Sequence, residues 1–407
     1  METRISFDNT EVAFAHLDNK QLKKAHFLFR LMGKPLLVRL GTRLAPWSLK
    51  AGLPVKGLIR NTIFEHFVGG ETLEEIIPVA KKLGEYNVKA IIDYGVEGKE
   101  GEDSFEHAKK EFIRVIKFAA TQPNIPFMSV KVTGFARFAL LEKIDTLMRT
   151  ADAKTLISRY NDALEQLSTD ELSEWNRVYD RMRSITIAAA ESKVGFLVDA
   201  EETWIQDPVD ALTILMMDEF NKGKLVVYNT IQLYRHDRLA FLMHSFEAAK
   251  QRNFVLGVKL VRGAYMEKER KRAETKNYPS PIQPHKEASD RDYNEAVRFC
   301  INNLEEIGVI VASHNEESNL LATELLKQKG YPLNHRHIHF SQLYGMSDNI
   351  TFNLARAGCS VSKYLPFGPI NDVIPYLMRR AQENTSVGGQ TSRELMLIKK
   401  EMKRRGR

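Results

Sequence analysis

Residues 255–265 read VLGVKLVRGAY, and this stretch carries the pattern that decides the fold. Its first seven positions form a short, mostly apolar run, which is typical of a strand buried in a parallel sheet. Lys259 and Arg262 bring two cations toward the end of this strand, and Gly263 and Ala264 leave little side-chain bulk there. We therefore predict a buried strand whose end faces a flat or anionic ligand.

Similar runs recur along the chain, and each is followed by a longer amphipathic stretch. The expected strands are residues 90–94, 127–133, 194–199, 225–228, 255–261, 308–312, 337–340 and 359–364. Strands that alternate with helices indicate parallel βα units. Eight such units favour an α/β fold in which a (β/α)8 TIM-type barrel closes on itself.

The remaining segments divide the chain into three parts. Residues 1–85 predict an N-terminal helical segment, residues 86–390 the barrel, and residues 391–407 a basic helical tail. The region 137–190 is too long for one crossover helix, so we expect a helical insertion after the second strand.

The chain has 407 residues and a formal charge of +7, with cations gathered in residues 30–60 and 399–407. Two interpretations stay open: solvated basic helix ends, or attraction to an anionic membrane surface. Nucleic acid is not an expected partner, because the charges are not interleaved with aromatic residues in a recognisable module.

Cysteine usage, the N-terminal residues and the length of apolar runs indicate the cellular compartment. Cys300 and Cys359 do not form a CxxC pair, which fits a reducing environment. Residues 1–8 contain early acids and no apolar segment, so they do not read as a signal or transit peptide. No apolar run approaches the roughly 18 residues of a membrane span. We expect a cytoplasmic protein, either free or peripheral on the inner membrane.

Charged residues stand at several strand ends, where barrel enzymes place their chemistry. Lys131 shares a strand face with Ser129 and Thr133, and it either meets a rim carboxylate or binds an anion. Asp199 either caps the next helix or belongs to the site. Lys259 lies within an apolar strand, where solvation alone does not account for it.

The sixth strand ends with Ser313, His314 and Asn315. A lone histidine is more often structural, but a hydroxyl, an imidazole and an amide together favour a binding role. Metal ligation by His314 and Asp199 is an alternative that lacks a second histidine at an adjacent strand end.

The sharpest feature follows the last strand. Tyr376, Arg379, Arg380 and Glu383 are spaced i, i+3, i+4 and i+7, so they share one helical face. An exposed charged stripe would look similar, but adjacent arginines also form a fork for a carboxylate. The residues alone indicate a barrel enzyme that acts on a small carboxylate.

Several stretches together resemble the proline dehydrogenase family from about residue 60 onward. They are VKLVRGAY at 258–265, ASHNE at 312–316, YLPFGP at 364–369 and PYLMRRAQEN at 375–384, with further similarity at 64–71 and 342–346. The resemblance implies a distorted barrel, FAD as cofactor, and oxidation of L-proline to Δ1-pyrroline-5-carboxylate with a membrane quinone as electron acceptor.

The resemblance also implies roles for individual residues. The substrate would contact Lys131, Leu343, Tyr364, Tyr376, Arg379 and Arg380. The cofactor would contact Ala200, Gln232, Lys259, Arg262, Gly263, Ala264, Ser313, His314 and Glu383. Lys131, Asp199 and Lys259 would act in catalysis, and no metal is implied.

One departure and two absences qualify this resemblance. Many bacterial relatives have arginine at the position of Lys259, so the flavin's potential and binding are expected to differ. No GxGxxG follows an expected strand, so a Rossmann unit is not indicated, and no second catalytic domain is recognised, which suggests the monofunctional form.

Two alternatives remain from the sequence. Hydroxyproline oxidation would use the same scaffold, although the Tyr364 phenol would crowd a ring hydroxyl. A non-enzymatic carboxylate-binding or membrane-scaffolding protein would keep the arginine pair without redox activity.

Overall fold

The computed structural model describes residues 5–34, 36, 38–41, 44, 56–95, 100–386 and 390–406. Its parallel strands follow one another in chain order around a closed barrel, which confirms the predicted fold class. The strands are β1 (Val88–Tyr94), β2 (Phe127–Val130), β3 (Gly195–Val198), β4 (Val227–Gln232), β5 (Leu256–Val261), β6 (Ile307–Ala312), β7 (Ile338–Leu343) and β8 (Val361–Phe367).

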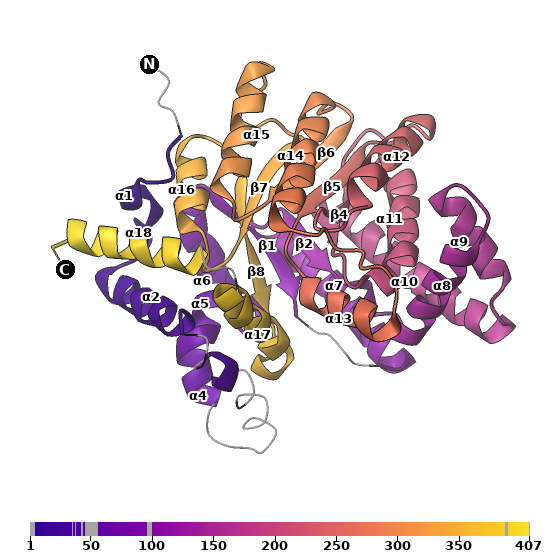
Figure 1. Ribbon diagram of the computed structural model, residues 1–407, viewed down its shortest axis with the longest axis horizontal. Helices are drawn as coiled ribbons and strands as arrows, with labels where there is room; N and C mark the ends of the chain where they lie inside the picture. Colours follow the sequence, from indigo (N-terminus) through magenta and orange to yellow (C-terminus); the bar gives the residue numbers. More distant parts are fainter. Residues whose placement is uncertain are drawn as a thin grey trace. The chain divides into compact units, whose positions relative to one another are not determined.

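Helices alternate with these strands (Figure 1). The described α-helices are α1 (Thr10–Ala13), α2 (Asn19–Met32), α4 (Lys56–Ile59), α5 (Glu65–Phe67), α6 (Leu73–Gly84), α7 (Glu102–Ala120), α8 (Phe138–Thr150), α9 (Leu156–Glu165), α10 (Thr169–Ser192), α11 (Gln206–Phe220), α12 (Arg238–Gln251), α13 (Met266–Lys276), α14 (Lys286–Asn302), α15 (Glu316–Gln328), α16 (Asp348–Arg356), α17 (Ile370–Ser386) and α18 (Gln390–Arg404). A π-helical turn, η1 (Arg60–Phe64), joins α4 to α5, and 3-10 turns η2 (Val132–Gly134) and η3 (Thr203–Ile205) follow β2 and β3.

Several strand boundaries differ from the predicted ones, including that of β8, which continues past residue 364 to Phe367. β2 ends at Val130 rather than at residue 133, because the chain turns into η2. β4 and β7 continue past their predicted ends, to Gln232 and Leu343. Their last residues include polar side chains that are buried, and Thr230, for example, donates a hydrogen bond of 2.7 Å to the Val198 carbonyl. Such buried polar positions break the apolar pattern on which a sequence-based boundary depends.

The chain contains two compact units, and each is described by itself. The larger unit comprises residues 97–339 and holds β2 to β6 as neighbouring parallel strands. The predicted insertion after the second strand is present as α8, α9 and α10, and α8 and α9 lie side by side in Figure 1. A capping box between Ser168 and Glu171 begins α10.

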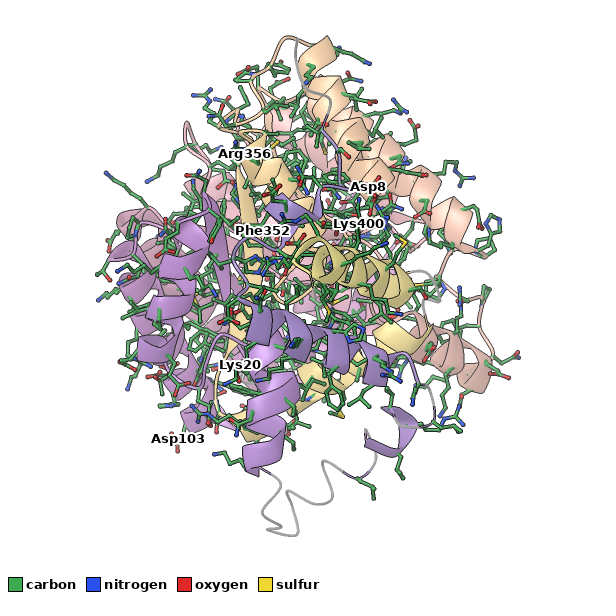
Figure 2. All side chains as sticks on the ribbon, turned by 90° about the vertical axis from the view of Figure 1, so that its left-hand side faces the viewer. Asp8, Lys20, Asp103, Phe352, Arg356 and Lys400 are labelled. Carbon is green, nitrogen blue, oxygen red and sulfur yellow. The ribbon has the colours of Figure 1, made fainter. Side chains whose placement is uncertain are left out.

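The other unit comprises residues 1–96 and 340–407, with β8 between β7 and β1. Helix α18 packs against α2 and α1, and these helices share a buried cluster that includes Phe14, Phe29 and Leu397. Figure 2 shows Asp8 beside Lys400, whose Nζ donates to the Asp8 carbonyl at 2.7 Å. The predicted domain boundaries at residues 85 and 390 stay a prediction.

The basic tail contacts the N-terminal segment through several of its cations. Arg405 donates to the carbonyls of Phe14 and Leu17, each at 2.8 Å, and Arg393 pairs with Asp8 at 2.8 Å. Some of the cations that suggested attraction to a membrane surface therefore form contacts inside this unit instead.

We predict that Gly257→Ala destabilises the barrel. An added Cβ would lie 2.1 Å from the Val227 carbonyl oxygen in neighbouring β4, so backbone must shift. We expect the free energy of unfolding to fall by about 3 kcal/mol in a urea titration. Gly57→Ala is the control, because its Cβ would meet nothing within 4 Å in α4 and should be neutral or slightly stabilising. Equal stability of both variants would contradict the close approach of β4 and β5.

Candidate active site

The larger unit brings three polar side chains together: Ser129 within β2, Asp199 directly after β3 and Lys259 within β5. Ser129 Oγ donates to Asp199 Oδ1 at 2.6 Å, and Lys259 Nζ forms an ion pair with the same oxygen. The side chains of Lys259 and Asp199 are only 6% and 12% exposed. The lysine that solvation could not explain is thus neutralised by a carboxylate from two strands away.

The charges around Asp199 keep it ionised. Burial alone would raise its pKa, but Lys259 and Lys131 outweigh burial and hold the pKa below its ordinary value. Lys131 directly follows β2 at the start of the η2 turn, whereas the sequence predicted it inside the strand. Two lysines therefore act on one carboxylate at this place in the barrel.

The loop after β3 is held by side chains of its neighbours. Thr133 Oγ1 donates to both carboxylate oxygens of buried Glu201, at 2.8 and 3.0 Å. Gln232 Nε2 donates to the Glu201 carbonyl at 2.6 Å and to the Tyr234 hydroxyl at 2.8 Å. Ala200 lies in this loop, half-buried. Gln232, predicted to touch a cofactor, therefore supports the β3 loop in this structure, and its cofactor contact stays a prediction.

Arg262 is anchored where β5 ends. Its Nη1 donates to Asp290 at 2.7 Å, and its Nη2 donates to Ser313 at 3.0 Å and to Ser318 at 2.8 Å. The guanidinium lies over the ring of Tyr293, 4.1 Å from its centroid. Burial lowers the pKa of Arg262, and the surroundings, including Tyr293 and Asp290, oppose this shift. This cation of β5 is fixed by residues that follow β6 and by α14.

The residues next to Arg262 leave room for a ligand. Gly263 is exposed with a φ of +95°, and a Cβ added there would meet nothing within 4 Å. Ala264 and His314 are half-buried. Guanidinium, hydroxyl and imidazole groups beside open backbone suit the anionic diphosphate of FAD, so the residues present fit that cofactor.

The smaller unit gathers the remaining predicted residues. Leu343 ends β7 and is the register partner of Tyr364 in β8. Leu343 and Tyr376 pack against one apolar cluster that includes Met346, Ile374 and Leu377. Two of the side chains predicted to enclose the substrate ring therefore pack on the same hydrophobic cluster.

Helix α17 presents the predicted arginine face. Arg380 is buried, and its Cζ lies 5.1 Å from the ring centroid of Tyr376, one turn earlier. Arg379 is half-buried. Glu383 belongs to α17, but its side chain lies outside the described ones.

The predicted residues therefore form two groups, one in each unit. The larger unit holds Lys131, Asp199, Ala200, Gln232, Lys259, Arg262, Gly263, Ala264, Ser313 and His314; the smaller holds Leu343, Tyr364, Tyr376, Arg379 and Arg380. The sequence did not single out Glu201 or Asp290, and it noted Ser129 only for its shared face with Lys131. The period-2 alternation of β2 was the signal for Ser129, whereas Asp290, in a polar helix, carried none.

The closed parallel barrel with charged groups at its strand ends is that of a barrel enzyme. A family model described as proline dehydrogenase matches residues 76–393. The chain belongs to the proline dehydrogenase family, a family of oxidoreductases, and the resemblance noted in the sequence is confirmed.

Individual proteins agree with this assignment. Proline dehydrogenase 1, mitochondrial, of Dictyostelium discoideum is 34% identical over 385 residues, which cover 88% of this chain and 67% of that protein. Hydroxyproline dehydrogenase of Xenopus laevis is 31% identical, covering 95% and 87%. The crystal structure of proline utilization A (PutA) from Bdellovibrio bacteriovorus, inactivated by N-propargylglycine, matches with a TM-score of 0.70 at 20% identity. That match covers 92% of this chain and 38% of PutA, and it shows the fold alone.

The part of the chain that the structure describes has no helix long and apolar enough to cross a membrane. The described residues also contain no group of three or more His, Cys, Asp or Glu side chains arranged to hold a metal ion.

We predict that Asp199→Asn destabilises the chain, because Lys259 would keep a buried ammonium beside a neutral amide. The expected loss is about 3 kcal/mol at pH 7, measured by urea unfolding. Since the folded pKa of Asp199 is lowered, its stabilisation is present above the ordinary aspartate pKa. The difference from wild type should therefore shrink as pH falls below about 4.

Ser129→Ala is the control, since it removes a hydrogen bond to Asp199 and leaves the ion pair in place. It should cost about 1 kcal/mol and show little of this pH dependence. A pH-independent loss for Asp199→Asn would contradict an ionised Asp199.

Proposed function

We propose that the protein oxidises L-proline to Δ1-pyrroline-5-carboxylate with FAD as cofactor, as the first step of proline breakdown toward glutamate. The observation that carries this proposal is the arginine face of α17 in a chain of the proline dehydrogenase family. Buried Arg380, beside Tyr376 and next to Arg379, suits a small carboxylate that is attached to an apolar ring.

The proposed substrate contacts follow from residue chemistry. Arg379, Arg380 and Lys131 would bind the carboxylate, and Leu343, Tyr364 and Tyr376 would enclose the pyrrolidine ring. Binding by several fixed groups orients C5 of proline and removes much of the entropic barrier.

The proposed cofactor contacts are those that the family resemblance implies. When bound, FAD would supply the acceptor for the hydride equivalent that leaves C5. Arg262, Gly263, Ala264, Ser313 and His314 would hold it, together with Ala200, Gln232, Lys259 and Glu383. The positive charge of Lys259 would stabilise a reduced, anionic flavin.

Asp199 has a narrower proposed role. Formation of the C5=N bond requires that the ring nitrogen lose its proton as two electrons leave with the C5 hydrogen. A carboxylate with a lowered pKa is a weak base, so Asp199 would orient the amine and Lys259 rather than keep the proton. The two electrons and two protons would finally reduce a quinone to its quinol.

A direct test is to load the recombinant chain with FAD and measure quinone-analogue reduction with L-proline and with trans-4-hydroxy-L-proline. We expect bound flavin absorbance and a turnover at least ten-fold higher with L-proline, because the Tyr364 phenol would crowd a ring hydroxyl. Hydroxyproline oxidation is the second candidate, since a hydroxyproline dehydrogenase is 31% identical. A colourless protein, or a preference for hydroxyproline, would overturn the proposal.

The membrane part of the proposal uses an exposed apolar stripe. Leu36, Leu40 and Leu44 lie at i, i+4 and i+8 and are 79%, 56% and 47% exposed, with exposed Arg30 and Lys34 nearby in the chain. Apolar and basic side chains together suit the surface of an anionic bilayer. This would place a cytoplasmic enzyme against the inner membrane, where quinone is found.

We predict that the protein sediments with vesicles of anionic lipid and much less with vesicles of phosphatidylcholine. Leu40→Glu should weaken this binding, because it places a carboxylate within the stripe. Met396→Glu is the control, since Met396 is also exposed but lies outside the stripe. Equal loss of binding in both variants would contradict a role for the stripe.

A further inference from the structure

The segment Leu343-Tyr344-Gly345-Met346-Ser347 joins β7 to α16 in an unusual backbone conformation. Gly345 has a φ of +77° and Ser347 a φ of +51°. A left-handed serine costs free energy that surrounding contacts must offset. The Tyr344 N–H donates to the Tyr364 carbonyl of β8 at 2.9 Å, and three side chains from other elements of the same unit also hold this segment.

Two of these side chains bind carbonyl oxygens. His66 in α5 lies with Nε2 2.8 Å from the Gly345 carbonyl, and burial lowers its pKa to about 4. The ring is thus neutral at pH 7, and Nε2 carries the proton because a carbonyl only accepts. Lys363 Nζ donates to the Met346 carbonyl at 2.5 Å and pairs with Asp348 at 2.7 Å.

The third side chain comes from the C-terminal helix. Glu394 in α18 accepts a hydrogen bond from the backbone N–H of left-handed Ser347 through Oε1. Both residues are buried, with Glu394 only 4% exposed. Helix α18 is itself fastened to the N-terminal segment by Lys400 and Arg405. The carboxylate therefore ties a fixed helix to the end of the β7 segment.

We propose that Glu394 is a positioning residue for the substrate pocket, acting through Ser347 on Leu343. The proposal rests on the proposed function, because Leu343 is a pocket wall only there. Leu343 is linked to the far end of the segment by the Met346 N–H, which donates to its carbonyl at 3.2 Å. Loss of the Glu394 contact removes one restraint on the left-handed conformation of Ser347, and the segment then shifts away from the ring of the substrate.

Glu401 provides a matched control on the same helix. It is fully buried and pairs with Arg404 at 2.9 Å and Arg405 at 2.7 Å, so its loss weakens the attachment of α18. Its carboxylate accepts hydrogen bonds from Arg404 and Arg405, which lie outside residues 343–347. A purely structural role for Glu394 would make the two alanine variants behave alike.

The experiment uses the full-length, FAD-loaded protein and its Glu394→Ala, Glu394→Gln and Glu401→Ala variants. Steady-state oxidation of L-proline gives KM and kcat. The dissociation constant of cyclopentanecarboxylate, which has the ring and carboxylate without the amine, comes from the flavin absorbance shift. We expect Glu394→Ala to raise KM and this constant about ten-fold with kcat within about two-fold, because the ring wall binds ground and transition states alike.

Glutamine keeps an oxygen acceptor without the charge, so Glu394→Gln should raise KM about three-fold. If the alanine variant does not fold, the KM of the glutamine variant tests the positioning role. Glu401→Ala should lower Tm and leave KM within about two-fold. Unchanged KM in both Glu394 variants, or equal KM changes in the two alanine variants, would overturn the positioning role. Wild-type protein that does not oxidise L-proline would overturn the proposed function, and this inference with it.

Discussion

The buried carboxylate of Asp199 is the group on which the arrangement of the larger unit's charged residues depends. Its Oδ1 accepts a hydrogen bond from Ser129 and pairs with Lys259. Residues of β2 and β5 therefore both contact one oxygen of the residue that follows β3. Without this carboxylate, an ammonium inside an apolar strand would be costly. With it, the barrel can hold the Lys259 ammonium inside a buried strand. Arg262 repeats the principle, since Asp290, two serines and the Tyr293 ring hold its guanidinium in place. In both cases the charge is fixed before any ligand arrives, which is how a site avoids reorganisation during a reaction.

In the smaller unit, the contacts fix apolar side chains rather than charges. Leu343 and Tyr376 share one hydrophobic base, and the segment after Leu343 is tied by His66, Lys363 and Glu394. The chain ends take part in this arrangement, because α18 packs against α2 and carries Glu394. The basic tail is therefore more than a solvated helix end, and the membrane proposal rests instead on the exposed leucine stripe near residue 40.

Much of this could be predicted from the sequence, because it depends on local periodicity. Short apolar runs alternating with helices predicted the barrel, and the i, i+3, i+4 spacing predicted the face of α17. The strand ends at Gln232 and Leu343 were predicted too early, since buried polar residues interrupt the apolar pattern. The pairing of Asp199 with Lys259 joins residues 60 apart, and only the register of the barrel brings them together. Glu394 could not be found at all, because its partner is a backbone N–H whose conformation has no signature in the residue type.

The fixed cations and the arginine face are proposed to serve a flavin-dependent oxidation of proline. The most direct measurement is an anaerobic absorbance spectrum of the FAD-loaded protein before and after addition of L-proline. The account predicts that the oxidised flavin bands bleach as proline is added, in the absence of any other reductant. A protein that binds FAD but keeps its oxidised spectrum in excess L-proline would contradict the account.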